Sequence, residues 1–201
     1  MKFRILAITL GCIVTFGLHS NAQAGRFHFN LGLNYVDGIN EVSDGLKDIY
    51  GAAYDEDIVV PVGLTLNPYY EFESGLGIGA VVGPASLIAI KQVGGGTDTT
   101  DISYIVPVGA EVRYTLLRDK ALSPYVKAGF RYPIAGGDNI DSSNVGFFGA
   151  AGVEFMHEKA VGFGLEVAYD TSEVTLKGSG GFTGKKEVKY PGLTVGVFVR
   201  F

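Results

Sequence analysis

The chain has 201 residues, of which 18% are charged, with 30 glycines, one cysteine and no tryptophan. This length allows one domain with a substantial core, and beyond the N-terminus no apolar run reaches the ~20 residues of a helical membrane span. The formal net charge of −5 argues against a nucleic-acid partner. Mean hydropathy is nevertheless +0.25, so apolar residues must be spread along the chain.

Residues 1–24 have the pattern of a secretory signal peptide, with a basic start, a short apolar stretch and small residues at its end. Cleavage is expected between Ala24 and Gly25, with Ala22 as the other small residue of the site. The short apolar stretch disfavours the alternative, a membrane anchor. Cleavage would remove Cys12 and leave 14 basic and 21 acidic residues, a net charge of −7. Disulfides, thiol catalysis and cysteine metal sites are then excluded.

From residue 25 onward, apolar and polar residues alternate, which is typical of strands with two different faces. In the first such segment Leu31 and Leu33 share one face, and Asn30 and Asn34 share the other. The predicted strands span residues 27–35, 58–72, 76–84, 102–116, 125–132, 145–155, 161–170 and 193–201.

Short and long connections alternate between these eight strands. The short ones are residues 73–75, 118–123 and 157–160, and the long ones are residues 37–57, 85–101, 133–144 and 171–191. This arrangement predicts an all-β fold over residues 25–201, an eight-stranded antiparallel up-and-down transmembrane β-barrel. An even strand number places both termini at the short-turn rim, which faces the periplasm in outer-membrane barrels.

The two faces of the strands decide between this barrel and a soluble, lipocalin-like one. One face is apolar in every strand, and the other carries charged residues and glycine. A closed eight-stranded barrel has little interior volume, so the bulky apolar face must look outward, into lipid. Aromatic residues near the strand ends predict the interfacial girdles, in the pairs Phe27 and Tyr35, Tyr104 and Tyr114, and Phe163 and Tyr169.

The signal sequence, the eight alternating strands and the terminal stretch 197–201 resemble the small outer-membrane β-barrel proteins of Gram-negative bacteria, of the OmpA/OmpX type. The resemblance covers the whole mature chain and implies an outer-membrane location. It also implies that Val199 and Phe201 form the signal read by the barrel-assembly machinery. Unlike OmpA, the chain is expected to be the barrel alone, without a periplasmic peptidoglycan-binding domain.

Motifs for catalysis or cofactor binding are weak. His28 is expected to face the lumen and His157 to lie in a solvated turn, and neither has a serine within a few residues, so a lipid-modifying enzyme is disfavoured. The glycines of 75–83 lie on a strand, and Gly184 precedes lysines without a following Ser or Thr, so nucleotide-binding motifs are excluded. We therefore expect no catalytic residue, cofactor or metal.

Two of the long connections have unusual charge. Residues 37–57 are acidic, and Asp55, Glu56 and Asp57 offer oxygen ligands for Ca²⁺, although a solvated surface loop is favoured. Residues 171–191 combine four lysines with glycines that suggest mobility, and the lysines could contact lipopolysaccharide phosphates. The ligand of either loop cannot be named from the sequence.

The charged residues of the inner face form the best-placed polar set. By alternation, seven of them point into the lumen: Glu111, Arg113, Lys127, Arg131, Glu154, Glu166 and Arg200. Pairing of the fourth and fifth strands brings Arg113 near Lys127 and places Glu111 within reach of Lys127. Buried charges must pair, so the set is either an ion-pair plug, which we favour, or the gate of a narrow channel.

These observations favour a non-enzymatic outer-membrane barrel that displays surface loops and has an envelope or surface-interaction role. A narrow channel for ions or small solutes, a lipid-modifying enzyme and an adhesin-like binder are the alternatives. The expected partners are outer-membrane lipid, lipopolysaccharide and, during biogenesis, the barrel-assembly machinery.

Overall fold

The structure, a computed structural model, describes residues 25–201 apart from residues 60, 95–96, 119 and 180. The predicted signal peptide lies outside these residues. None of the helices described here is long and apolar enough to cross a membrane.

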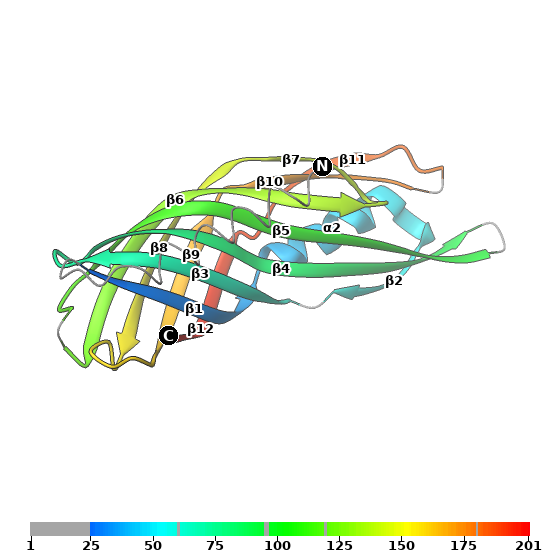
Figure 1. Ribbon diagram of the computed structural model, residues 1–201. Coiled ribbons are helices and arrows are strands. Elements are labelled where there is room, and N and C mark those ends of the chain that lie inside the picture. The colour runs from blue at the N-terminus through cyan, green and yellow to red at the C-terminus, as the bar shows by residue number, and fades with distance from the viewer. Residues whose placement is uncertain (1–24, 60, 95–96, 119, 180) are drawn as a thin grey trace, which may run out of the picture.

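Eight antiparallel strands close into a barrel, as the alternation of apolar and polar residues predicts (Figure 1). They are β1 Gly25–Val36, β3 Val62–Phe72, β4 Leu76–Gly94, β5 Thr97–Thr115, β6 Leu122–Gly137, β8 Gly146–Phe155, β9 Gly162–Asp170 and β12 Leu193–Arg200. Around the barrel the order is β4, β3, β1, β12, β9, β8, β6 and β5, and pairing of β5 with β4 closes the cylinder. Closure pairs the backbone groups that a sheet edge would leave free in hydrocarbon.

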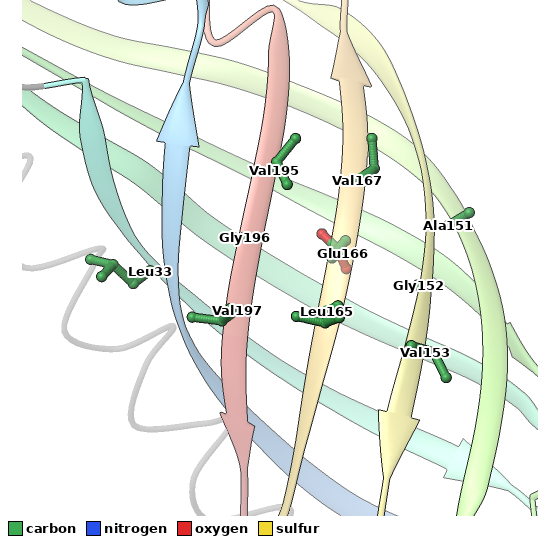
Figure 2. A pocket seen from close by; sticks show the side chains of 10 residues that line it. All are labelled: Leu33, Ala151, Gly152, Val153, Leu165, Glu166, Val167, Val195, Gly196 and Val197. Carbon is green, nitrogen blue, oxygen red and sulfur yellow. The ribbon is translucent and has the colours of Figure 1, made fainter.

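The apolar face of the strands is the outer face. Along β9, Leu165 and Val167 are each 50% exposed, while the carboxylate of Glu166 between them points inward and accepts a hydrogen bond of 2.7 Å from Tyr125. Figure 2 shows Leu165 and Val167 beside Val195 and Val197 of the paired strand β12, around a shallow apolar groove on the barrel wall. This exposed apolar band requires a lipid environment.

Three short turns and the end of β12 mark one rim of the barrel, which we call the turn rim. The turns are residues 73–75, 116–121 and 156–161. Gly75, with φ of +81°, adopts the left-handed conformation that glycine tolerates at the first of these turns. At the same rim Phe201 exchanges backbone hydrogen bonds with Phe29. The short connections predicted from the sequence are thus confirmed to within two residues.

The long connections differ from the prediction. They are not open loops but contain strands and a helix. Strands β4 and β5 continue beyond the barrel, and β2 Tyr54–Val59 pairs with β4 there. Strands β7 Ile140–Asn144, β10 Glu173–Lys177 and β11 Lys185–Lys189 form a separate three-stranded sheet. We call these parts, together with the helix described next, the cap (Figure 1).

Residues 37–57 hold a helix instead of the predicted solvated loop. Helix α2, Gly38–Tyr50, is followed by a 3-10 turn, η1, Gly51–Ala53, and Gly51 ends the helix with φ of +54°. Ile39, Val42 and Leu46 are fully buried on one face of α2, at the three- and four-residue spacing of an amphipathic helix. The acidic residues that suggested a loop, including Asp44, lie on the opposite, exposed face.

Prolines explain two further differences from the predicted strands. The predicted strand 58–72 is divided into β2 and β3 near Pro61, because β2 pairs with the outer part of β4 and β3 pairs with β1 and β4 in the barrel wall. The predicted strand 76–84 does not stop at Pro84. Instead the pairing of β4 with β5 shifts register between Val82 and Ser86, at a bulge that accepts a residue without a backbone N–H.

Candidate functional site: the barrel interior

All seven lumen residues predicted from the sequence lie in the barrel interior. Six of them are at most 5% exposed: Glu111, Arg113, Lys127, Arg131, Glu154 and Arg200. The seventh, Glu166, keeps 15% of its side chain exposed. Glu71, Asp170, His28 and His157 join them, and we call these eleven residues the charged interior.

At the turn-rim end of the charged interior, several side chains meet at the carboxylate of Glu154. Its carboxylate is 3.0 Å from Nη2 of Arg113 and 3.7 Å from Nε of Arg200, and it contacts the ring of His157. The Arg113 guanidinium lies between the rings of Tyr69 and Tyr125, at 4.7 and 3.6 Å from their centroids. Ion pairing and cation–π contacts together compensate the desolvation of this fully buried guanidinium.

Farther from the turn rim, Lys127 lies between two carboxylates. Its ammonium is 2.8 Å from Glu166 and 3.3 Å from Glu111. Arg113 and Lys127 are directly opposite each other in the β5–β6 pairing, as expected, and Glu111 reaches Lys127. Lys127 thus has two carboxylate partners, and Glu154 has two guanidinium partners, those of Arg113 and Arg200. The positive and negative charges of the interior are therefore close to balance.

The last ion pair before the cap joins Arg131 of β6 to Asp170 at the end of β9, at 3.3 Å. The Arg131 guanidinium also lies 4.0 Å from the ring centroid of Phe148. Asp170 in turn accepts hydrogen bonds from the backbone N–H, at 2.7 Å, and the hydroxyl of Ser172. The charged interior therefore extends from the turn rim to the point where β9 leaves the barrel.

An apolar core lies directly above this pair and fills the cap. Ile105 of β5 precedes Glu111 by six residues and lies nearer the cap. It is fully buried and packs with residues of α2 and of the three-stranded sheet. The core consists of Val36, Ile39, Val42, Leu46, Tyr50, Ile88, Ile105, Ile140, Val174, Leu176, Val188 and Tyr190. The interior is thus charged in the barrel and apolar in the cap.

Some members of the site were missed from the sequence. His157 is 1% exposed and contacts Glu71 and Glu154, so the predicted solvated turn is wrong: the turn folds its histidine into the barrel mouth. Glu71 is a further member of the site, and alternation with Tyr70 and Phe72 on the outer face is the sequence signal that places it inside. Its contact with His28 joins neighbouring strands. Its contacts with His157 and Arg118 reach two turns of the rim, and no local pattern encodes them.

The lysines of residues 171–191 are largely engaged within the cap. Lys186 contacts Asp48 of α2, Lys185 is 2.7 Å from Asp141 of β7, and the ammonium of Lys189 is 3.4 Å from the hydroxyl of Tyr169. The predicted mobile loop is therefore a hairpin tied to its neighbours.

The candidate metal ligands are the acidic side chains of residues 55–57 and the histidines. The side chains of Asp55, Glu56 and Asp57, the candidate Ca²⁺ ligands, lie outside those that the structure describes. Among the described residues, no group of three or more His, Asp or Glu side chains is arranged to hold a metal ion. The two histidines that the structure describes, His28 and His157, instead contact charged side chains of the interior.

The family is decided by a match over almost the whole chain. A family model described as "outer membrane protein beta-barrel domain" matches residues 8–201. The chain belongs to this outer-membrane β-barrel family. The resemblance seen in the sequence is thereby confirmed at the family level, as is an outer-membrane barrel of Gram-negative type.

Two solved structures of outer-membrane proteins share the fold. The outer membrane protein OprG from Pseudomonas aeruginosa aligns with a TM-score of 0.53 and 15% identity, over 89% of this chain and 97% of that one. The solution structure of E. coli outer membrane protein W aligns with a TM-score of 0.50 and 17% identity, over 89% and 98%. No curated protein matches the chain. These likenesses show the fold alone.

Proposed function

We propose that this outer-membrane barrel is a non-enzymatic protein that displays its cap at the cell surface, with both termini in the periplasm and a lumen closed to solutes. The proposal rests on one observation: side chains fill the interior in both the barrel and the cap. Ion pairs occupy the barrel from Glu154 to Arg131, and the apolar core of α2 and the three-stranded sheet lies above them. Eight strands leave little room for a solute beside these side chains.

The contacts of the histidines support a non-enzymatic role. His28 contacts Glu71 and the guanidinium of Arg200, and His157 contacts two carboxylates. An acyl-transfer site needs a histidine that takes a proton from a nucleophile. In this interior the histidines are instead bound to charged partners.

The outer face supports the proposed partners. Val199 and Phe201 are 40% and 53% exposed on the outer face at the turn rim, where the assembly machinery could reach the terminal strand. The exposed apolar band contacts membrane lipid. At the cap end of this band, the ammonium of Lys189 lies 3.4 Å from the hydroxyl of Tyr169, and this exposed cation supports a contact with a lipopolysaccharide phosphate.

Conductance in planar bilayers tests the closed lumen. The wild-type barrel should insert without a steady conductance, because both the ion pairs and the apolar core would have to move before an ion could pass. Insertion is checked independently by the shifted gel mobility of the unboiled, folded barrel. A steady conductance from protein inserted in this way would replace the proposal with the narrow channel.

Protease treatment of intact cells tests which end is displayed. Gly181, Thr183 and Gly184, which precede β11 at the cap end of the molecule, are exposed, and the chain should be cut there. The turn at residues 73–75 should be spared, since it lies at the opposite rim. Cleavage at 73–75 in unbroken cells would invert the proposed orientation.

A further inference from the structure

The turn between β8 and β9, residues 156–161, carries a histidine whose two ring nitrogens both face carboxylates. Nδ1 of His157 contacts Oε2 of Glu154, and Nε2 is 3.1 Å from Oε2 of Glu71. The two carboxylates come from different strands, β8 and β3. A neutral imidazole has one N–H and can donate to only one of them, whereas an imidazolium donates to both.

His28 lies in the same cluster, with its ring centroid 5.8 Å from that of His157, but its partners demand the other charge state. Nδ1 of His28 is 2.9 Å from Nη1 of Arg200, which can only donate, so Nδ1 must accept. Nε2 of His28 is 3.3 Å from Glu71 and carries the proton. The arrangement therefore fits a neutral His28 next to a charged His157.

Other charged groups act on His157 from every side of the barrel mouth. The guanidinium groups of Arg113, Arg200 and Arg118 lie 3.0, 3.7 and 3.8 Å from the two carboxylates, and the Tyr69 hydroxyl donates to Glu154 at 3.4 Å. These positive charges and the burial of the ring oppose protonation. Hydrogen bonds to Glu154 and Glu71 outweigh the burial and hold the pKa of His157 above its ordinary value of 6.5.

The turn is also held by contacts that do not depend on a proton. The guanidinium of Arg200 donates hydrogen bonds of 3.2, 3.1 and 2.9 Å to the carbonyls of Met156, His157 and Lys159. Met156 adopts a φ of +57°, which is uncommon for a residue other than glycine and costs free energy that the surrounding contacts must supply. The backbone N–H of Met156 also donates to the carbonyl of Ala121 in the neighbouring turn, at 2.6 Å. These attachments do not titrate, whereas the attachment through His157 does.

The geometry points to a proton-binding site at His157 that fastens the β8–β9 turn across the barrel mouth. With the proton bound, the imidazolium bridges Glu71 and Glu154. When the proton leaves, a nitrogen lone pair faces one of the two carboxylates, and the turn loosens around its Arg200 attachment. The device acts at the turn rim alone, so it does not depend on whether the cap is displayed or the lumen conducts.

The sign of the pH dependence follows from the raised pKa. The contribution of His157 to closure is complete below about pH 6.5, its ordinary pKa, and is lost as the pH rises through the higher pKa of the folded state. Across that window the opening equilibrium of the turn should increase roughly tenfold for each unit by which the pKa exceeds its ordinary value.

Nitrogen NMR of the two imidazoles in the full chain, held in detergent micelles or nanodiscs, tests the assignment directly. Between about pH 5 and about pH 9, His157 should begin with both nitrogens protonated and titrate above its ordinary pKa. His28 should be neutral near pH 7, with its proton on Nε2. A His157 that is already neutral near pH 6 would overturn the proposal.

Amide hydrogen exchange of residues 156–161 tests the consequence, with Glu158→Gln, at an exposed position of the same turn, as the control for His157→Gln. In the wild type, exchange should rise with pH by more than the intrinsic base-catalysed increase. His157→Gln should give fast exchange at every pH, whereas Glu158→Gln should keep the extra pH dependence. If the extra pH dependence survives in His157→Gln, the proposal is wrong. Should that variant not fold, the NMR titration of the wild type decides alone.

Discussion

The charged interior and the apolar core of the cap lie end to end in one molecule, and they are buried by opposite means. In the charged interior, Arg113 and Glu154 are fully buried and depend on each other. In the cap, Leu46 of α2 is equally buried and depends on the volume around it. A buried charge is costly when one partner is removed, whereas a buried leucine is costly in proportion to the cavity that it leaves. The interior of the barrel is therefore stabilised by ion pairs, and the interior of the cap is stabilised by apolar packing.

Glu154→Gln should have the largest effect, because it removes the carboxylate on which the charged interior depends at the turn rim. The amide keeps the shape of the side chain but leaves Arg113, Arg200 and the His157 ring without their shared carboxylate. Breaking such a buried pair costs about 3–5 kcal/mol. Urea unfolding of the reconstituted barrel measures the loss. Glu158→Gln, in an exposed position of the same region, should be neutral, and equal losses in the two variants would contradict a paired interior.

Leu46→Ala should destabilise the apolar core of the cap. The cavity left between α2 and its neighbours should cost the cap about 2–5 kcal/mol. Because the barrel strands have their own hydrogen bonds, the loss should appear as faster amide exchange in α2 and in the sheet of β7, β10 and β11, with the barrel amides still protected. Lys47→Ala, one residue along on the exposed face, is the control. Uniform loss of protection would show that the two regions unfold as one.

The eight barrel strands could be predicted because each must show an apolar face to lipid and a polar face to the lumen. That requirement is local and appears as alternation. The cap has no such constraint: α2 encodes its buried face only as Ile39, Val42 and Leu46 at helical spacing, within an acidic segment that suggested a loop. The signal was present, but it was obscured by the charges on the exposed face of α2.

The charged interior could be predicted in membership but not in most of its contacts. The pairing of Lys127 with Glu111 follows from neighbouring strands. The contacts of Glu71 with His157 and of Arg113 with Glu154 cross the lumen and depend on how the barrel closes, through its stagger and tilt. For the same reason the burial of His157 in a turn could not be seen in the sequence.

Leu165→Arg sharpens the distinction between interior and lipid face within one strand. A charge on the outer wall near the bilayer midplane should cost about 2–4 kcal/mol, and folding yield into bilayers should fall. Val161→Arg, on the same face at the turn rim, should cost roughly 0–1 kcal/mol, because the headgroup region accepts the charge. Glu166→Gln should fold, since Lys127 retains Glu111. Equal tolerance of Leu165→Arg and Glu166→Gln would mean that the inside–outside assignment of β9 is wrong.

Lys185→Gln should have the smallest effect, at the cap surface. The hydrogen bond from Lys185 holds the pKa of Asp141 below its ordinary value of 3.8. The contribution of this pair is present above that value and is lost as the pH falls through the lower pKa of the folded state. In the variant, an NMR titration should show the Asp141 pKa returning upward. Lys159→Gln, at the opposite rim, should leave the titration unchanged.

Arg200 links the most distant parts of the sequence. It lies on β12, the strand that joins β1 to β9, and its hydrogen bond to His28 connects residues 172 positions apart. The same guanidinium fixes the turn after β8. An intermediate without β12 in place therefore holds Glu154 and His157 without this partner, and the interior is completed only when the two ends of the barrel sequence meet. Because the chain entropy of that encounter is lost before the contacts repay it, folding should be slow and its late stage all-or-none.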